Sequence, residues 1–397
     1  MRKNQAMISI APQAPSAANR FLLAAGFLGL AACSNTPAIE TAAPPPSEEP
    51  VAQADPEPAR PAANEKNMVA VLVPLSGDNA AIGRSIANAA TMALLDTGEE
   101  SVRITLYDTA GSGGSAAAAN EALADGNRLF LGPLRGEDVG IVGPIADRAD
   151  VPVIAFSNDE SVAGDNVYIM GFMPGQSIER VVDYADSQGA DVFAALAPNG
   201  LYGQRTTQAF LRAVEREGGR VARVETYDRS RPSVEAAARR VAGVSDVDMV
   251  LVADSGRIAQ IAAPSLQLQG TLIGTELWAA DSNLGSVAGM RGAVFAAVPD
   301  TQFQRMAQRY RSRYDTAPYR LASLGYDAML LVVRLARDWD LGDDFPARAL
   351  RDDGGFSGVD GIFRFGDDRI AERALEVRRV TAGGTEVVSP ASTSFDD

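Results

Sequence analysis

The sequence predicts an α/β protein with two lobes, each built on a parallel β-sheet flanked by helices. From Met68 onward, short apolar segments alternate with longer alanine-rich segments in which apolar residues recur at helical spacing. This alternation is typical of βαβ units and of a parallel sheet. The strand-like segments are apolar along their whole length, as expected where a sheet is covered on both faces. The order of segments then repeats in the second half of the chain, which favours two lobes over one.

The first series of segments is expected to form the first lobe. Its expected strands are MVAVLVPL (68–75), VRITLYD (102–108), RLFLGPL (128–134) and VPVIAFSN (151–158), and its expected helices are 82–96, 115–126 and 140–150. The loop GSGGSA (111–116) matches a dinucleotide fingerprint, but it belongs to the second βα unit and not to the first. We interpret it as a loop whose Ser115 caps the following helix.

The second series predicts another sheet of the same kind. Its expected strands are DVFAALAPN (191–199), VARVETYD (221–228), DMVLVAD (248–254) and TLIGTE (271–276), and its expected helices are 203–219, 233–243 and 257–270. Ligands of such sheets bind outside the carboxyl ends of the strands or between domains. The candidate loops therefore lie at Ser76, Gly132, Ser157, Asn199, Asp254 and Glu276.

The composition excludes several kinds of chemistry. The chain has no histidine, one cysteine and only two lysines, Lys3 and Lys66. A Ser-His-Asp triad, a histidine-ligated metal, a P-loop and a lysine Schiff base are therefore impossible in the folded part. No motif gathers the remaining carboxylates, so we predict neither an enzyme nor a cofactor or metal site. The formal net charge of −15 argues against a nucleic-acid partner.

The N-terminus has the pattern of a signal peptide over residues 1–32. Arg2, Lys3 and Arg20 precede the apolar segment FLLAAGFLGLAA (21–32), whose length of about 12 residues suits a signal peptide and is too short to span a membrane. The only cysteine of the chain, Cys33, follows at once. An ordinary secretory signal with a chance cysteine at the cleavage site is the alternative to a lipidation signal.

Residues 30–33, LAAC, resemble the lipobox of bacterial lipoproteins. That resemblance implies cleavage before Cys33 and lipidation of its thiol, which would anchor the chain stably in a membrane. The next residue is Ser34 and not Asp, which in this family implies the periplasmic face of the outer membrane. From Cys33 to Lys66 the chain is rich in Pro, Ala and Glu and holds no aromatic residue, so we expect a disordered tether.

The order of motifs after the tether resembles type I periplasmic binding proteins of the leucine-binding group. The matching segments are 69–94, LFLGPL (129–134), VPVIAFSND (151–159), 201–219, LIGTELW (272–278), 303–336 and GFSGVDGIFRFGDD (355–368). The resemblance covers about residues 67–388. It implies two lobes joined by three crossovers that close over a ligand.

The resemblance also implies the extents of the lobes. The first lobe would comprise about 67–186 and 297–340, and the second about 187–296 and 341–388. We expect the last segment, 389–397, to be a disordered tail.

The resemblance implies a ligand site between the lobes. In amino-acid binders of this group a carboxylate holds the ligand ammonium, and backbone amides with a hydroxyl hold its carboxylate. The corresponding positions in this chain are Ser76, Gly132, Ser157, Asp159, Tyr202 and Glu276. Asp159 stands where the hydroxyl is expected, and a carboxylate there would repel a ligand carboxylate. The arginine usual near GFMPGQ (171–176) is also missing.

Two functions follow from the resemblance. Some proteins of this fold are outer-membrane lipoproteins that activate penicillin-binding proteins, the enzymes that build peptidoglycan. The lipobox, Ser34, the tether and the altered amino-acid site favour that function, with a penicillin-binding protein or another cell-wall synthase as partner. The alternative is an amino-acid substrate-binding lipoprotein of an ABC transporter, which Tyr202 and Glu276 favour.

Overall fold

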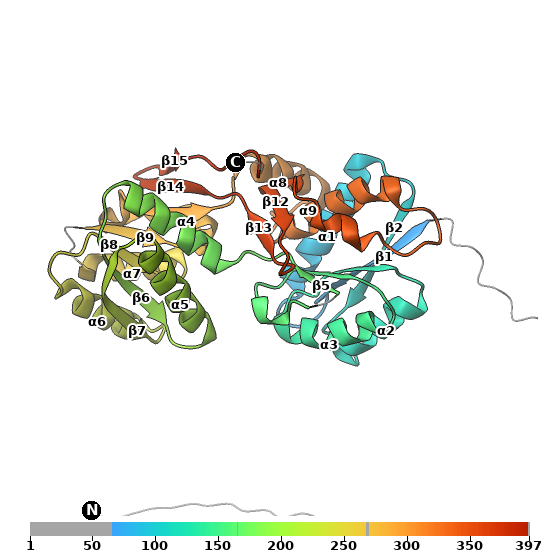
Figure 1. Ribbon diagram of the computed structural model, residues 1–397, viewed down its shortest axis with the longest axis horizontal. Helices are drawn as coiled ribbons and strands as arrows, with labels where there is room; N and C mark the ends of the chain where they lie inside the picture. The colour runs from blue at the N-terminus through green and yellow to red at the C-terminus, as the bar shows by residue number, and fades with distance from the viewer. Residues whose placement is uncertain (1–65, 165, 267–269, 396–397) are drawn as a thin grey trace, which may run out of the picture. The chain divides into compact units, whose positions relative to one another are not determined.

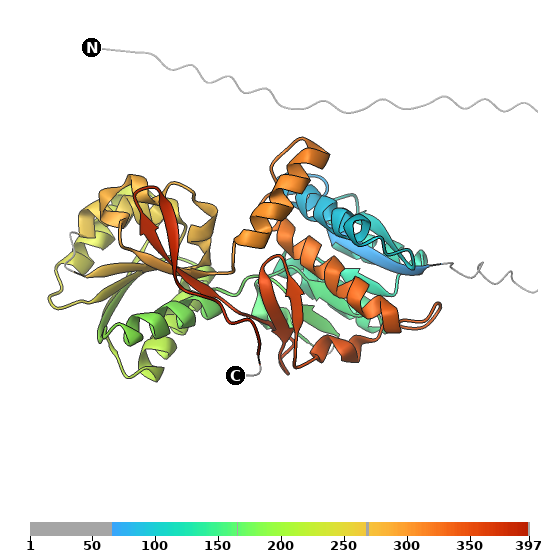
Figure 2. The same ribbon diagram turned by 90° about the horizontal axis from the view of Figure 1, so that it is seen from above.

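The structure is a computed structural model that describes residues 66–164, 166–266 and 270–395, which form two α/β lobes (Figures 1 and 2). The predicted signal peptide, the lipidation site Cys33 with Ser34, and the tether as far as residue 65 lie outside the described residues. Among the residues that are described, no helix is long and apolar enough to cross a membrane.

Lobe 1 is built on a five-stranded parallel sheet with the order β2-β1-β3-β4-β5. The strands are β1 (Asn67–Val73), β2 (Val102–Asp108), β3 (Leu129–Leu131), β4 (Val153–Ala155) and β5 (Val167–Ile169). The helices are α1 (Ala80–Thr97), α2 (Gly114–Ala124), α3 (Gly136–Asp147), α8 (Thr301–Tyr314) and α9 (Ala322–Leu335). One apolar cluster joins the sheet to α1, α8 and α9, and another joins it to α2 and α3. Both faces of the sheet are therefore covered, as its apolar strands require.

Lobe 2 contains a seven-stranded sheet with the order β15-β14-β10-β9-β8-β6-β7. The strands are β6 (Val192–Pro198), β7 (Arg220–Tyr227), β8 (Met249–Val252), β9 (Thr271–Gly274), β10 (Val294–Ala297), β14 (Glu376–Thr381) and β15 (Gly384–Ser389). The first five are parallel, whereas β14 and β15 add an antiparallel hairpin beside β10. The helices are α4 (Pro174–Ser187), α5 (Leu201–Arg216), α6 (Arg231–Ala242) and α7 (Gly256–Leu266).

A small antiparallel sheet and six short 3₁₀ helices complete the described fold. The sheet consists of β11 (Phe356–Gly358), β12 (Gly361–Phe365) and β13 (Ala371–Arg373). The 3₁₀ helices are η1 (Glu160–Val162), η2 (Glu276–Ala280), η3 (Leu284–Ser286), η4 (Ala288–Met290), η5 (Ala336–Asp338) and η6 (Ala347–Arg351). The chain crosses between the lobes three times, at 171–173, 298–300 and 374–375, in agreement with the predicted two-lobed fold.

The lobe boundaries differ from the predicted ones in two places. Helix α4 was expected in lobe 1, but its apolar side packs with Phe193 and Phe210 of lobe 2. The segment 341–373 was expected in lobe 2, but its aromatic residues belong to the lobe 1 core, and Figure 1 shows β12 and β13 beside that lobe. The apolar stripes of these segments require burial, but they do not specify against which lobe.

Within the predicted tail 389–397, Ser389 is the last residue of β15, and the ring centre of Phe395 lies 4.5 Å from the guanidinium carbon of Arg364. One further expectation is corrected by the structure. Ser115 was expected to cap a helix, but it is the second residue of α2 and Gly113 occupies the cap position without a side-chain hydrogen bond.

In each lobe, a glycine lets the first turns of a helix pack directly against the end of the preceding first strand. A Cβ atom added to Gly83 of α1 would lie 1.9 Å from the carbonyl oxygen of Pro74, and one added to Gly203 of α5 would lie 1.6 Å from that of Pro198. Only glycine permits such close approach of a helix to the end of a strand. These two contacts hold the loops that carry Ser76 and Tyr202.

A buried group of charged side chains lies where the crossovers enter lobe 1, and we call it the crossover cluster: Arg320, Arg373, Asp327 and Asp360. Arg320 donates to Asp360 at 2.7 Å, and Asp327 accepts hydrogen bonds from two backbone N–H groups beside β11. Both guanidinium carbons lie within 5.5 Å of the ring of Phe172 in the first crossover. Burial, and then the charge of Asp360, raise the pKa of Asp327.

Candidate functional site

The predicted site residues lie at the carboxyl ends of strands in both lobes. Ser76 follows β1, Gly132 follows β3, and Ser157 and Asp159 follow β4 in lobe 1. Tyr202 and Glu276 come after β6 and β9 in lobe 2 and lie in the first turns of α5 and η2. This is the edge at which parallel α/β sheets bind their ligands.

The Ser76 loop is held by a carboxylate from the neighbouring strand. Asp108, at the end of β2, accepts hydrogen bonds from the backbone N–H groups of Leu75 at 2.7 Å, Ser76 at 3.3 Å and Ala110 at 2.9 Å. Burial opposes ionisation of Asp108, but these hydrogen bonds outweigh it and lower its pKa. The Ser76 amide is therefore already engaged, while the residue itself is exposed.

The backbone N–H of Gly132 is used in a hydrogen bond to the neighbouring strand and is not free for a ligand. Its N–H donates to the carbonyl oxygen of Ile154 at 2.8 Å. Its φ of +101° is in the left-handed region, and an added Cβ would lie 2.0 Å from the carbonyl oxygen of Leu72. Glycine is therefore required here by backbone conformation and by the close approach of β1.

Ser157 and Asp159 form a compact turn. Ser157 is buried, and its hydroxyl accepts a hydrogen bond from the backbone N–H of Asp159 at 3.0 Å. One carboxylate oxygen of Asp159 in turn accepts hydrogen bonds from the backbone N–H and the hydroxyl of Ser161, at 3.0 and 2.5 Å. The hydroxyl expected to bind a ligand is thus used to shape the loop.

An ion pair connects this turn to the other lobe. Arg205 of α5 donates from Nη2 to Oδ1 of Asp159 at 2.6 Å. The Asp159 side chain is 23% exposed and that of Arg205 is 35% exposed, so solvent screens the pair only in part. Burial opposes ionisation of Asp159, but the hydrogen bonds from Ser161 and Arg205 lower its pKa below the usual value. The carboxylate is therefore charged and neutralised by Arg205.

Tyr202 and Glu276 lie close together in lobe 2. The Tyr202 hydroxyl is 3.5 Å from that of Thr275, and burial followed by the charge of Glu276 raises the pKa of Tyr202. Oε2 of Glu276 accepts a hydrogen bond from Ser177 of α4 at 2.6 Å. Although Glu276 keeps some solvent exposure, burial of its carboxyl raises its pKa to about 7. Near neutral pH, this group is thus only partly ionised.

The last two candidate loops, at Asn199 and Asp254, are also closed by internal hydrogen bonds. Asn199 donates from its side chain to Asp228 at 2.8 Å. Asp254 is buried and accepts from Arg229 at 2.8 Å and from the Tyr227 hydroxyl at 3.1 Å. Its backbone carbonyl also accepts from the indole of Trp278 at 3.1 Å. Both side chains therefore have partners before any ligand arrives.

A pocket of about 510 Å³ lies between the lobes, beside the second crossover. Its lining includes Trp278 and Asp281 of lobe 2, Asp300 of the crossover, and Tyr319 and Arg320 of lobe 1. Sequence reasoning assigned none of these residues to the site, although Trp278 ends the LIGTELW motif and Tyr319 and Arg320 lie in the matching segment 303–336. The aromatic residues after α8 are the signal that could have pointed to them. Among the described residues, no cluster of acidic side chains has the arrangement of a metal site.

Comparison with known proteins agrees with this architecture. The model of a family described as periplasmic binding protein matches residues 68–385. A solved structure of a branched-chain amino acid ABC transporter protein from Rhodospirillum rubrum superposes with a TM-score of 0.71, 19% identity and coverage of 81% of this chain and 100% of that one. A leucine-binding protein LivK from Thermotoga maritima superposes with a TM-score of 0.61 and 19% identity, and the match covers 82% of this chain and 99% of that one. At these identities the structures show the fold alone.

Curated relatives are similar over shorter segments. An uncharacterized protein of Rickettsia prowazekii is 25% identical over 179 residues, which are 45% of this chain and 48% of that protein. A penicillin-binding protein activator LpoA from Photobacterium profundum is 26% identical over 182 residues, which are 45% of this chain and 29% of that protein. The LpoA of Vibrio antiquarius is 27% identical over 152 residues, which are 36% of this chain and 25% of that protein. The chain therefore matches about half the length of these relatives or less.

The family match spans most of the chain, and it includes both lobes and all three crossovers. Each lobe is built on five parallel strands with helices on both faces, and the candidate loops lie at the carboxyl ends of these strands. The chain therefore belongs to the periplasmic binding protein family, with a leucine-binding-like type I fold.

Proposed function

We propose that this chain is a non-catalytic lipoprotein that binds and activates a cell-wall synthase, most specifically a penicillin-binding protein. The observation that carries the proposal is the ion pair between Asp159 and Arg205. It lies at the position where the resemblance implies hydroxyl and amide donors for a ligand carboxylate. The same position here presents a carboxylate that is already neutralised from within the chain.

The other groups expected to bind an amino acid have internal partners as well. The Ser76 and Gly132 amides donate within the chain, whereas Ser157 accepts a hydrogen bond from its own turn. A ligand would have to replace the two amide hydrogen bonds, so binding there would gain only the difference between old and new contacts. Such an arrangement favours a role through protein contacts over capture of a small molecule.

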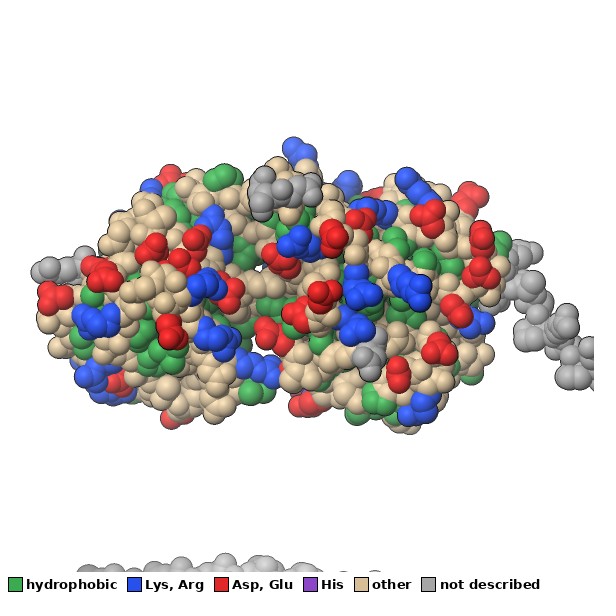
Figure 3. Space-filling model, in the orientation of Figure 1, with side chains coloured by type: hydrophobic (Ala, Val, Ile, Leu, Met, Phe, Trp, Pro, Cys, Tyr) green, Lys and Arg blue, Asp and Glu red, His purple; other side chains and the backbone are tan. Residues whose placement is uncertain are grey.

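Two relatives support the synthase as partner, because both are named as penicillin-binding protein activators. The predicted lipidation of Cys33, with Ser34 after it, would place the chain on the periplasmic face of the outer membrane. The predicted tether would let the folded part extend toward the cell wall, at about 3.1 Å per residue when extended. On the face shown in Figure 3, acidic and basic side chains are interspersed over both lobes.

Amino-acid binding for an ABC transporter remains the second candidate. Tyr202 and Glu276 favour it, because they lie together at the carboxyl edge of lobe 2. A carboxylate there could hold a ligand ammonium if it were ionised. Against it stands the hydrogen bond of Glu276 to Ser177 and the rise of its pKa to about 7.

Crosslinking in intact cells tests the proposal. A photoreactive residue is placed at exposed positions on each lobe of the full-length chain, such as Tyr319 and Leu201, and the captured proteins are identified by mass spectrometry. We expect covalent capture of a penicillin-binding protein, and loss of that capture in Cys33→Ala, which removes the predicted anchor. Failure to capture any peptidoglycan synthase from positions on both lobes would contradict the proposal.

A thermal-shift screen against the standard amino acids separates the two candidates. A ligand at a hundredfold excess over its Kd adds about 2.7 kcal/mol to stability. For a domain of this size that corresponds to a rise in Tm of about 4 °C. We expect no such rise. A saturable rise that is lost in Glu276→Ala would instead support the transport function.

A further inference from the structure

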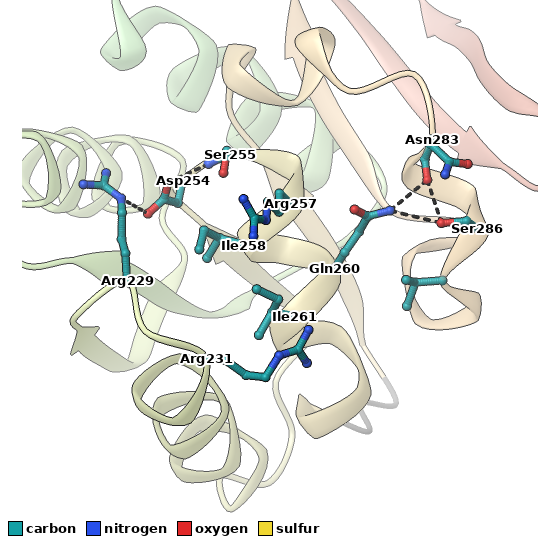
Figure 4. Close-up of a pocket in the computed structure, with 11 residues that line it drawn as sticks. Arg229, Arg231, Asp254, Ser255, Arg257, Ile258, Gln260, Ile261, Asn283 and Ser286 are labelled. Atoms are coloured by element: carbon teal, nitrogen blue, oxygen red, sulfur yellow. Dashed lines mark hydrogen bonds and ion pairs between the residues drawn. The ribbon is translucent and has the colours of Figure 1, made fainter.

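A second pocket, of about 640 Å³, lies on lobe 2 and is lined by three arginines (Figure 4). Its residues include Arg229, Arg231, Arg257 and Gln260, together with one carboxylate, Asp254 of the candidate loop after β8. It shares no lining residue with the pocket between the lobes. The inference drawn from it therefore does not depend on the proposed function.

The topology of lobe 2 brings the three arginines together. Arg229 lies in the turn after β7 and Arg231 is the first residue of α6, whereas Arg257 is the second residue of α7, which follows β8. Both helices therefore begin at the pocket, although Pro232 in the first turn of α6 has no N–H, and the N–H of Ser255, just before α7, already donates to Asp254 at 2.7 Å. Two helix N-termini add a positive potential to that of the guanidinium groups.

The positive charges at the pocket are only partly compensated. Arg229 donates to Asp254 at 2.8 Å, and Arg231 is paired with Glu235 at 3.3 Å. Arg257 is exposed and has no hydrogen-bond or ion-pair partner among the described residues. One cation thus remains without a counter-charge, in a chain whose net charge is −15. In such an acidic chain, a local excess of positive charge marks a place where an anion is attracted.

The walls of the pocket suit an organic anion. In Figure 4, Ile258 and Ile261 lie between Arg257 and Arg231, while the guanidinium of Arg229 is directed at Asp254; the two isoleucines are what we call the apolar floor. On the opposite wall, Gln260 donates to the carbonyl oxygen of Asn283 at 2.8 Å and to the hydroxyl of Ser286 at 3.2 Å. The charged and apolar parts of the lining would contact different parts of one ligand.

We propose that this pocket binds a small organic phosphate. Guanidinium groups from three chain positions line the pocket, the one at Arg257 is unpaired among the described residues, and the two helix N-termini add positive potential. That arrangement matches a tetrahedral phosphate, whereas one guanidinium fork already satisfies a planar carboxylate. The phosphate would lie near Arg257 and the helix N-termini, and the organic part would lie over Ile258 and Ile261.

Titration calorimetry of the full chain tests this inference, with inorganic phosphate and glycerol 3-phosphate as probes at constant ionic strength. We expect saturable binding of both, tighter for glycerol 3-phosphate because its carbon chain can cover the apolar floor. Arg257→Gln should weaken binding at least about tenfold, since it removes a charged donor. Arg212→Gln is the matched control, because Arg212 of α5 is also exposed and unpaired among the described residues.

Three outcomes would overturn the inference. One is the absence of saturable binding of either probe up to about 10 mM, a concentration that would detect even weak sites. Another is equal loss of affinity in Arg257→Gln and Arg212→Gln, which would mean general charge attraction. The third is tighter binding of citrate than of either phosphate, which would assign the pocket to carboxylates. An unchanged Tm in Arg257→Gln checks that the variant is folded.

Discussion

Replacement of Glu276 by Gln is expected to change the pH dependence of stability in a defined direction. Burial raises the pKa of Glu276 to about 7, from an ordinary value of 4.5. In the unfolded chain the carboxyl ionises first, so the folded state loses stability as the pH rises from about 4.5 to about 7. Above pH 7 both states are ionised and this loss is complete. The amide of the substituted glutamine cannot ionise, so the variant should lack this loss.

The structure gives the size of the effect. Each pH unit between the two pKa values costs about 1.4 kcal/mol, which sets an upper limit of about 3.4 kcal/mol. Partial solvent exposure of Glu276 reduces this to about 2–3 kcal/mol, or about 3–4 °C in Tm for a chain of this size. The amide of Gln can donate to the Ser177 hydroxyl, which lies 2.6 Å from Oε2 of Glu276. Ser177 can then donate to the carbonyl oxygen of Pro174, 3.0 Å away.

Urea denaturation at several pH values between about 5 and about 8 measures the difference between wild type and Glu276→Gln. We expect the variant to gain about 1.5–2 kcal/mol relative to wild type across this range, because part of the loss occurs below pH 5. Glu179→Gln, a more exposed change on α4, should show no such trend. A difference between wild type and Glu276→Gln that stays constant with pH would refute the reasoning.

Three further changes probe the packing. Arg373→Met should cost about 1–3 kcal/mol in urea denaturation, because the carbonyl oxygen of Met170 loses its buried donor at 2.8 Å and Arg320 is left as the one arginine of the crossover cluster; Arg364→Gln, in a more exposed pair, should cost less than about 1 kcal/mol. Gly132→Ala should lower Tm sharply, whereas Gly140→Ala, with open space around it in α3, should leave Tm unchanged or raise it. Arg205→Gln should lower the free energy of unfolding by less than about 1 kcal/mol, as measured by the same denaturation, because its ion pair is partly exposed.

The core strands of both lobes were predictable because each is a continuous apolar segment between turn signals. β1, β6 and β8 lie within one to three residues of the expected positions. The hairpin of β14 and β15 was not predicted as strands, because charged residues interrupt the buried valines of β14 and half of β15 is exposed, so neither shows an apolar run. Local sequence determined the elements, while contacts over long separations determined to which lobe a segment belongs.

The site was predictable in position but not in chemistry. Loops at the carboxyl ends of strands follow from the sheet topology alone. The hydrogen-bond partners of the side chains on these loops do not follow from the topology. Asp159 and Arg205 are 46 residues apart in the sequence, and Ser177 and Glu276 are 99 residues apart. A sequence shows that such side chains are polar, but only the folded chain shows that they satisfy one another.

This internal pairing makes the two candidate functions distinguishable by proton release. With a pKa of about 7, Glu276 is about half protonated at pH 7. An amino-acid ammonium bound beside it would favour the ionised form, so binding would release about half a proton per ligand. Calorimetry in buffers with different ionisation enthalpies measures that release. If the chain acts through protein contacts, adding amino acids should release no protons, and Glu276 should stay linked to Ser177. Release near half a proton, abolished in Glu276→Gln, would therefore place an amino acid at this carboxyl and would argue against the synthase as the chain's principal partner.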